Sequence, residues 1–348
     1  MGSAHRRLPL TPTIAVLTVA LLASVLFATG FGAASIPAAD VYEVLRAHVL
    51  GAATESARDS ITWGIRVPRV LLGALVGAGL ALAGAVIQTL VRNPLADPYL
   101  LGISSGASVG ATAVITTGFL SVIGTWALPF GALAGALAAA VLVFGVAMAQ
   151  GGLTPIRLVL TGTVLSSAFS AMASFLVFRS QDPQAAQSVL FWLLGSLAGA
   201  AWSQLPMAAL AILPIGVVLL FGHGWLDALA AGPDVAATLG VRVKTLRIGV
   251  FVLQAILVGV VVAVAGGIGF VGLIVPHIAR LLVGPLHRAV LPVSALLGAL
   301  FLIWVDVAAR TAAIPREIPL SVVTGLVGAP VFLYLLGRRR YAFGGGAS

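Results

Sequence analysis

The sequence has no cysteine, a single lysine (Lys244) and only ten acidic residues among 348 positions. Without cysteine, disulfide bonds and thiolate metal sites are excluded. Charged residues make up 8% of the chain and hydrophobic residues 60%, with a mean hydropathy of +1.13, whereas a soluble domain carries about 25% charged residues. The chain is therefore an integral membrane protein. Its net charge of +9 comes from scattered arginines, so it does not indicate nucleic-acid binding.

Several kinds of active site are also missing. Lys244 follows a valine where a phosphate-binding loop needs glycine, so this polypeptide does not bind ATP in that way. The histidines lack the spacing of metal ligands. Asp306 is the nearest candidate for an intramembrane carboxylate, but Arg310 follows one helical turn later and is positioned to pair with it. The energy for any transport is thus expected from a partner, and an ion-coupled secondary transporter remains the alternative from another class.

Charge-poor runs predict an all-α protein with about ten membrane-spanning helices in a single domain over residues 1–348. The expected spans are 12–34, 67–91, 99–118, 127–149, 156–178, 205–222, 246–269, 273–284, 289–311 and 318–337. Basic residues at both ends, Arg6 with Arg7 and Arg338 to Arg340, favour cytoplasmic termini.

Two loops on the expected outer surface, 35–65 and 179–204, are long enough to carry structure of their own. In the first, apolar residues from Val41 to Val49 recur at helical spacing and predict a short interfacial helix. The second contains an apolar stretch, 185–197, that is too short to span a membrane.

The segment from Arg92 to Pro98 (RNPLADP) lies between two long apolar runs. Its prolines and charges cannot face hydrocarbon, so it must lie at a membrane surface or against water inside the protein. The stretch from Ala83 to Pro94 also aligns without gaps to Ala265–Pro276. This match predicts an inverted internal repeat, about 62–178 and 246–337, of the kind that recurs in transporters. Chance similarity of small apolar residues is the alternative.

Glycines recur at every fourth position in two places, at Gly102, Gly106 and Gly110 and again at Gly73 and Gly77. Such spacing allows the backbones of two helices to approach closely. The favoured interpretation is tight helix packing. A smooth wall beside a translocation path is the alternative.

Eight segments together resemble the permease subunits of ABC importers for iron-siderophores, haem and cobalamin. They are Arg66–Arg69 (RVPR), Gly84–Gln88 (GAVIQ), Arg92–Pro98, Leu101–Ser108 (LGISSGAS), Gly269–Arg280 (GFVGLIVPHIAR), Asp306–Arg310 (DVAAR), Glu317–Pro319 (EIP) and Gly328–Leu336 (GAPVFLYLL). They occur in order and with compatible spacing, which makes the resemblance specific.

The resemblance implies the architecture of a type II ABC importer permease in a bacterial cytoplasmic membrane. It implies a dimer of permeases, homomeric or heteromeric, with two cytoplasmic ATPases and an external substrate-binding protein. No cofactor is then bound by this chain, since ATP and Mg belong to the ATPases. Arg66, Arg69 and Arg310 match family arginines that face outward and receive carboxylates of the binding protein.

The resemblance also implies two sites on the cytoplasmic side. Asn93, Pro94 and Leu95 match a loop that narrows the exit, and Thr154 lies in the neighbouring gate segment. The ATPase-coupling residues are Asp234, Val235, Ala236, Leu239, Gly240 and Val241. Two departures stand out: Pro233 replaces a common acidic residue, and Leu286 replaces another before His287, which puts a polar role of that second loop in doubt.

The expected function is ATP-driven import of an Fe(III)-siderophore, with cobalamin or haem as the alternative cargo. Few polar groups are recognisable along the expected pathway, so affinity for cargo is expected to reside in the binding protein.

Overall fold

The computed structural model describes residues 8–52 and 56–338, and every regular element in this part of the chain is a helix. Arg6, Arg7, Arg339 and Arg340, which carry the expectation about the termini, lie outside the described residues. The long helices are α1 (Leu10–Gly30), α4 (Val67–Leu90), α6 (Ala127–Ala149), α7 (Pro155–Arg179), α9 (Gln204–Phe221), α12 (Val243–Ala265), α14 (His287–Thr311) and α15 (Leu320–Arg338). The shorter ones are α2 (Ala38–Val49), α3 (Ala57–Asp59), α5 (Ile103–Thr117), α8 (Pro183–Leu193), α10 (His223–Ala231), α11 (Pro233–Thr238) and α13 (Val271–Val283). A π-helical turn, η1 (Ser60–Arg66), precedes α4, and two 3₁₀ segments are η2 (Pro98–Leu101) and η3 (Ser121–Trp126).

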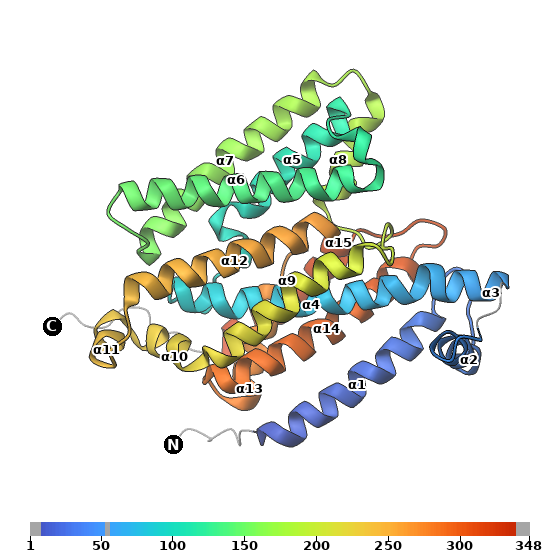
Figure 1. Ribbon diagram of the computed structural model, residues 1–348, viewed down its shortest axis with the longest axis horizontal. Coiled ribbons are helices and arrows are strands. Elements are labelled where there is room, and N and C mark those ends of the chain that lie inside the picture. The colour runs from blue at the N-terminus through green and yellow to red at the C-terminus, as the bar shows by residue number, and fades with distance from the viewer. Residues whose placement is uncertain (1–7, 53–55, 339–348) are drawn as a thin grey trace.

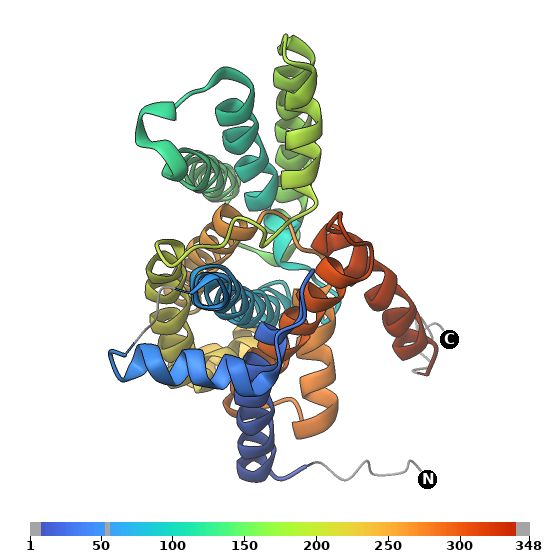
Figure 2. The same cartoon turned by 90° about the vertical axis from the view of Figure 1, so that its right-hand side faces the viewer.

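Helix α4 lies at the centre of the molecule and packs against α14, α13, α12 and α9 (Figures 1 and 2). It has no charged side chain after Arg69, and most of its residues are buried. Backbone contacts between glycines bring its neighbours close. A Cβ atom at Gly84 would overlap the carbonyl of Gly272 in α13, and one at Gly77 would overlap that of Gly298 in α14. These small residues therefore set the distance between the three helices.

Helices α5, α6 and α7 form a second group beside the helices packed around α4. Figure 2 shows this second group standing apart from α13 and α14. Gly106 and Gly110 of α5 face Gly135 and Gly131 of α6, and an added Cβ at either α5 position would meet the facing backbone. The packing interpretation of this glycine spacing is confirmed. Gly102 has another role. It adopts a left-handed conformation, with a φ of +74°, at the residue that ends η2 and directly precedes α5.

Seven helical segments in the described residues are long and apolar enough to cross a membrane. Of the other three expected spans, two correspond to shorter helices, α5 with 15 residues and α13 with 13, and the third corresponds to α15 with 19. Helix α13 is short because the chain leaves helical geometry from Gly266 to Phe270, where Phe270 has a φ of +68°. A helix of 13 residues covers about 20 Å, less than the hydrocarbon thickness of a bilayer.

The two aligned stretches of the expected repeat differ in conformation. Residues 83–90 are helical within α4, whereas 266–270 are not helical and separate α12 from α13. The residue-by-residue alignment therefore does not hold at the level of local structure. The larger inverted repeat stays a prediction.

The ends of the molecule carry its short helices. At one end, called the α2 end here, lie α2, α3 and α8; at the opposite α11 end lie α10 and α11 (Figure 1). The predicted short helix is present as α2, which buries Val41, and its place at the membrane interface stays a prediction. The apolar stretch in the second loop corresponds to α8. Each candidate site from the sequence lies at one of these two ends.

Candidate functional site

At the α2 end, five charged residues from distant parts of the chain form one cluster. The guanidinium of Arg69 donates from Nε and Nη2 to Oδ1 of Asp306, at 3.0 and 2.8 Å. It also donates from Nη1 and Nη2 to the two carboxylate oxygens of Glu317, at 2.7 and 2.8 Å. The expected pairing of Asp306 with Arg310 is confirmed by a separation of 3.3 Å between Arg310 Nε and Asp306 Oδ2. This contact is an ion pair without hydrogen-bond geometry.

Two of these arginines hold the end of helix α1. Arg66 Nη1 donates to the carbonyls of Thr29 and Gly30 at 3.2 and 2.8 Å, and Arg310 Nη2 donates to that of Ala28 at 2.9 Å. The last carbonyls of a helix have no partner within the helix and carry partial negative charge. Arg66 and Arg310 satisfy them and thereby fasten α1 to η1 and α14.

Arg66, Arg69 and Arg310 lie at this end of the molecule but are buried rather than exposed, and their role in docking stays a prediction. Their exposed fractions are 6%, 7% and 7%, because each is engaged by carbonyls or carboxylates of the chain itself. The accessible members of this surface are Glu317, whose side chain is 40% exposed, and the exposed Arg316 beside it. Hydrogen bonding to Arg69 lowers the pKa of the Glu317 carboxyl below its usual value. The sequence alone did not reveal that Glu317 pairs with Arg69 or that Arg316 is exposed beside it, although Glu317 lies within the Glu317–Pro319 segment.

At the α11 end, the Asn93–Leu95 turn follows directly from the end of α4. Asn93 N–H donates to the Gln88 carbonyl at 3.0 Å and Arg92 N–H to the Thr89 carbonyl at 3.2 Å. This is the Schellman pattern, with Arg92 in the left-handed region at a φ of +53° where glycine is usual. The Asn93 side chain then accepts from Leu95 N–H at 2.9 Å. The predicted gate loop is thus a tight turn held by its own hydrogen bonds.

Thr154 lies at the start of α7, and its buried hydroxyl has no hydrogen-bond partner among the described residues. It lines a cavity of about 470 Å³ together with Lys244 and Arg247 of α12. Arg247 donates to the Leu153 carbonyl at 3.4 Å and is close enough to Arg92 for like-charge repulsion. The two predicted gate segments therefore flank Arg247, but no hydrogen bond joins them directly in the described structure.

The predicted coupling residues form helix α11 and its end. Asp234, Val235, Leu239 and Gly240 are exposed, whereas Ala236 is buried and Val241 is half-buried. Val241 N–H donates to the Ala236 carbonyl at 2.9 Å, with Gly240 at a φ of +76° between them, so this helix also ends in a Schellman motif. Val235 and Leu239, 46% and 67% exposed, leave an apolar patch on a rigid turn.

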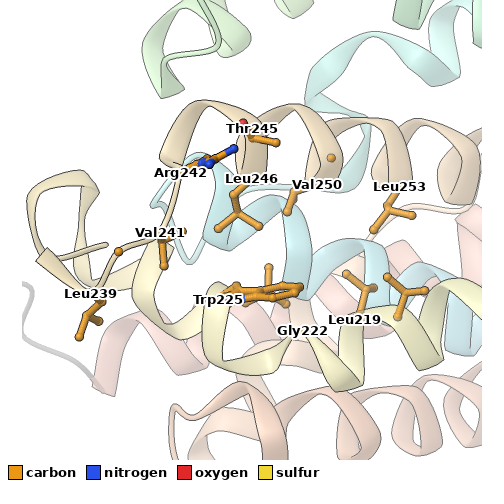
Figure 3. Close-up of a pocket in the computed structure, with 14 residues that line it drawn as sticks. Leu219, Gly222, Trp225, Leu239, Val241, Arg242, Thr245, Leu246, Val250 and Leu253 are labelled. Carbon is orange, nitrogen blue, oxygen red and sulfur yellow. The ribbon is translucent and has the colours of Figure 1, made fainter. Parts of the chain in front are cut away.

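Beside α11 runs an apolar groove of about 510 Å³ between α9, α10 and α12. Figure 3 shows the ring of Trp225 lying across it, with Leu246 and Val250 of α12 above the ring. Leu239 stands at one end of the groove and Leu253 at the other. The surface around α11 therefore offers more apolar area than the helix alone.

A further polar network at this end was not expected from the sequence. His287, the first residue of α14, contacts both Asp227 and Thr89 and is 3% exposed. The doubt about a polar role of this loop is wrong, because Asp227 of α10 supplies a carboxylate that the loop itself lacks. Arg280 donates to the side-chain oxygen of Gln88, whose amide donates in turn to the Leu273 carbonyl at 3.2 Å.

These features fit what comparison with known proteins shows. The profile of the FecCD transport family matches residues 20–338. The chain belongs to this family. It is therefore the membrane-spanning permease subunit of an ABC importer, which assembles with an ATPase and a binding protein and is not itself catalytic. No bound cofactor is expected on a FecCD permease.

Relatives with different stated cargoes resemble this FecCD permease to similar extents. The cobalamin import permease of Halobacterium salinarum is 44% identical over 78% of this chain and 72% of its own length. The hemin transport permease of Yersinia pestis is 41% identical over 82% of this chain and 86% of its own. The molybdate import permease of Haemophilus influenzae is 37% identical over 91% and 92%.

A solved structure, described as an inward-facing conformation of a metal-chelate type ABC transporter, has the same fold. Its TM-score is 0.82 at 33% identity, and the match covers 94% of this chain and 99% of the other. The predicted all-helical, multi-span architecture of a type II importer permease is thereby confirmed.

Proposed function

We propose that this permease forms the conduit of an ATP-driven importer that carries an Fe(III)-siderophore. The observation that carries the ATP-driven mechanism is the pairing of Asp306, the buried carboxylate of α14, with both Arg69 and Arg310. A carboxylate paired with two guanidinium groups of its own chain is engaged in structural contacts and is not a free site for a coupling ion. The energy then comes from the ATPase. Uptake by the purified chain alone, driven only by an ion gradient, would instead establish the secondary-transporter alternative.

The choice of cargo is supported by two relatives from Bacillus subtilis whose names specify iron. An Fe(3+)-citrate import permease is 37% identical over 92% of this chain, and an iron(3+)-hydroxamate import permease is 39% identical over 81%. The relatives named for cobalamin and hemin support the alternative cargoes at comparable identity.

The cargo is tested on the cognate binding protein, by thermal shift with ferric hydroxamates, ferric citrate, haem, cobalamin and molybdate. We expect stabilisation by a ferric siderophore alone. Stabilisation by cobalamin or haem, with none by the ferric hydroxamates or ferric citrate, would contradict the proposal and identify the alternative.

For the assembly we infer a pair of permeases, homomeric or heteromeric, with two ATPases below and one binding protein above, in a bacterial cytoplasmic membrane. The α11 end then faces the cytoplasm together with both termini, and residues 1–348 form one membrane domain. The short exposed helix α11 supports this orientation, since it offers a patch for docking in a groove. A reporter fused after Ser348 tests it: activity of an exported reporter outside the membrane would contradict it.

We propose further that the charged cluster at the α2 end docks the binding protein. Arg66, Arg69 and Arg310 build the cluster, and a carboxylate of the binding protein competes with Glu317 for Arg69. Glu317→Gln should then strengthen docking, by about fivefold. The matched control Asp182→Asn removes one negative charge from the same end without touching Arg69 and should leave docking unchanged. Weaker or unchanged docking of Glu317→Gln would contradict the competition.

At the α11 end we propose that Asn93, Pro94, Leu95 and Thr154 narrow the cytoplasmic exit. The hydrogen-bonded turn supports movement of the first three as one piece. Enlarging Leu95 to Trp should slow cargo release while ATP hydrolysis continues. A flux equal to that of the unmodified permease would place the constriction elsewhere.

A further inference from the structure

One chain of hydrogen bonds joins three helices at the α11 end. Asp227 lies on α10, His287 begins α14 and Thr89 belongs to the last turn of α4. Asp227 Oδ1 lies 2.6 Å from His287 Nδ1 and 2.9 Å from His287 backbone nitrogen, and His287 Nε2 lies 2.7 Å from Thr89 Oγ1. His287 and Thr89 are 3% and 4% exposed, so water does not compete for these contacts.

The proton positions along this chain follow from the donor and acceptor chemistry. The Asp227 carboxylate only accepts, so His287 Nδ1 carries a proton. In a neutral imidazole Nε2 is then the acceptor, and the Thr89 hydroxyl donates to it. The same hydroxyl oxygen lies 2.9 Å from the Ala85 carbonyl of its own helix. With one proton and two acceptors, the Thr89 hydroxyl has two discrete arrangements, one between helices and one within α4.

The two ends of the chain lie next to the two candidate sites on this side of the molecule. Asp227 belongs to α10, which leads through Gly232 directly into α11. The backbone carbonyl of Thr89 accepts a hydrogen bond from the Arg92 N–H at 3.2 Å, the first bond of the Asn93–Leu95 turn. The path from α11 to the turn therefore consists of short directional contacts that are buried at its middle, at His287 and Thr89.

We propose that Asp227, His287 and Thr89 are positioning residues that connect movement of the α10–α11 segment to the Asn93–Leu95 turn. The inference rests on the proposed function, because it requires an ATPase that acts on α11. When α10 shifts against α14, Asp227 leaves His287 and the ring loses its fixed orientation. The Thr89 hydroxyl then returns to Ala85, and the last turn of α4 is released from α14 together with the turn that it anchors.

The absence of cysteine provides a direct test, because Leu95→Cys introduces a single thiol for a spin label on the turn. The labelled permease is placed in nanodiscs with its ATPase, and label mobility is measured with and without a non-hydrolysable ATP analogue. Thr89→Val should reduce the nucleotide-dependent change by about fivefold. Thr89→Ser, which keeps the hydroxyl, should retain it.

Two further variants separate this connection from general damage. Thr163→Val removes a hydroxyl that bonds only to the Val159 carbonyl of its own helix, at 2.9 Å, and should leave the change intact. Asp227→Ala alters a residue whose side chain is 26% exposed, so we expect this variant to fold. It therefore tests the connection if Thr89→Val fails to fold. It should reduce the change as Thr89→Val does, while the ATPase remains bound.

A full-sized nucleotide-dependent change in Thr89→Val or in Asp227→Ala would overturn the inference. Failure of the proposed function has a different signature. In that case the labelled parent itself shows no response to nucleotide, or no ATPase copurifies with it.

Discussion

Replacing Asp306 with Asn tests whether the buried charge cluster at the α2 end holds the fold together. Asp306 is 1% exposed and accepts three hydrogen bonds from Arg69, at 2.8, 3.0 and 3.2 Å, while Arg310 lies 3.3 Å away. Asparagine keeps the shape of the side chain and removes its charge. Arg69 and Arg310 then remain buried beside a neutral group.

Breaking a buried ion pair by removing the charge of one partner costs about 3–5 kcal/mol. Arg69 retains Glu317, so we expect the lower end of this range, about 3 kcal/mol. At about 2 °C per kcal/mol for a chain of this size, the midpoint of thermal unfolding should fall by about 6 °C. Intrinsic fluorescence in detergent measures this midpoint, since the chain has six tryptophans.

The same substitution at Asp40 is the matched control. Asp40 pairs with Arg58 at 2.7 Å, but the two side chains are 25% and 60% exposed. Such a pair is worth less than about 1 kcal/mol, so Asp40→Asn should shift the midpoint by about 2 °C or less. Equal shifts for the two variants would refute the reasoning. Adding Arg310→Gln to Asp306→Asn removes one of the stranded charges and should recover part of the loss.

Three other expectations can be measured in the same preparations. Leu239→Asp places a charge on the 67% exposed apolar patch of α11 and should detach the ATPase in a pull-down, whereas normal ATP-driven uptake would contradict the coupling role. Gly84→Ala forces α4 away from α13 and should cost about 1–3 kcal/mol, whereas Gly249→Ala, with open space around the new Cβ, should be neutral or slightly stabilising. The Glu317 contribution to stability should be fully present above the usual carboxyl pKa of 4.5, since Arg69 lowers its pKa, and should be lost as the pH falls further below that value. A loss of this contribution already between pH 7 and 5, measured against Glu317→Gln, would contradict the lowered pKa.

Features that depend on nearby residues could be predicted from the sequence. The apolar runs predicted the long helices, and the spacing from Val41 to Val49 predicted α2. The separation of four residues predicted the Asp306–Arg310 pair. The glycine spacing predicted close packing, which α5 and α6 confirm.

The burial of the arginines could not be predicted, because their partners lie far away in the sequence. Arg66 donates to Gly30, 36 residues before it, and Arg69 to Glu317, 248 residues after it. The network around His287 escaped prediction for the same reason, since its carboxylate lies on another helix, 60 residues earlier. Composition places an arginine near a membrane surface, but the carbonyls of α1 and the carboxylates of Asp306 and Glu317 decide that these guanidinium groups turn inward.

The contacts between glycine backbones in α4, α13 and α14 restrict how the helices of this permease can move against one another. Helices that touch through main-chain atoms have no flexible side chains between them to absorb sliding, so we expect these three to travel as one rigid unit during a transport cycle. Rearrangement then falls to the boundary with the α5–α7 group. Pairs of introduced cysteines across the α4–α13 contact should form disulfides equally well with and without nucleotide, and a yield that depends on nucleotide would show that the unit comes apart.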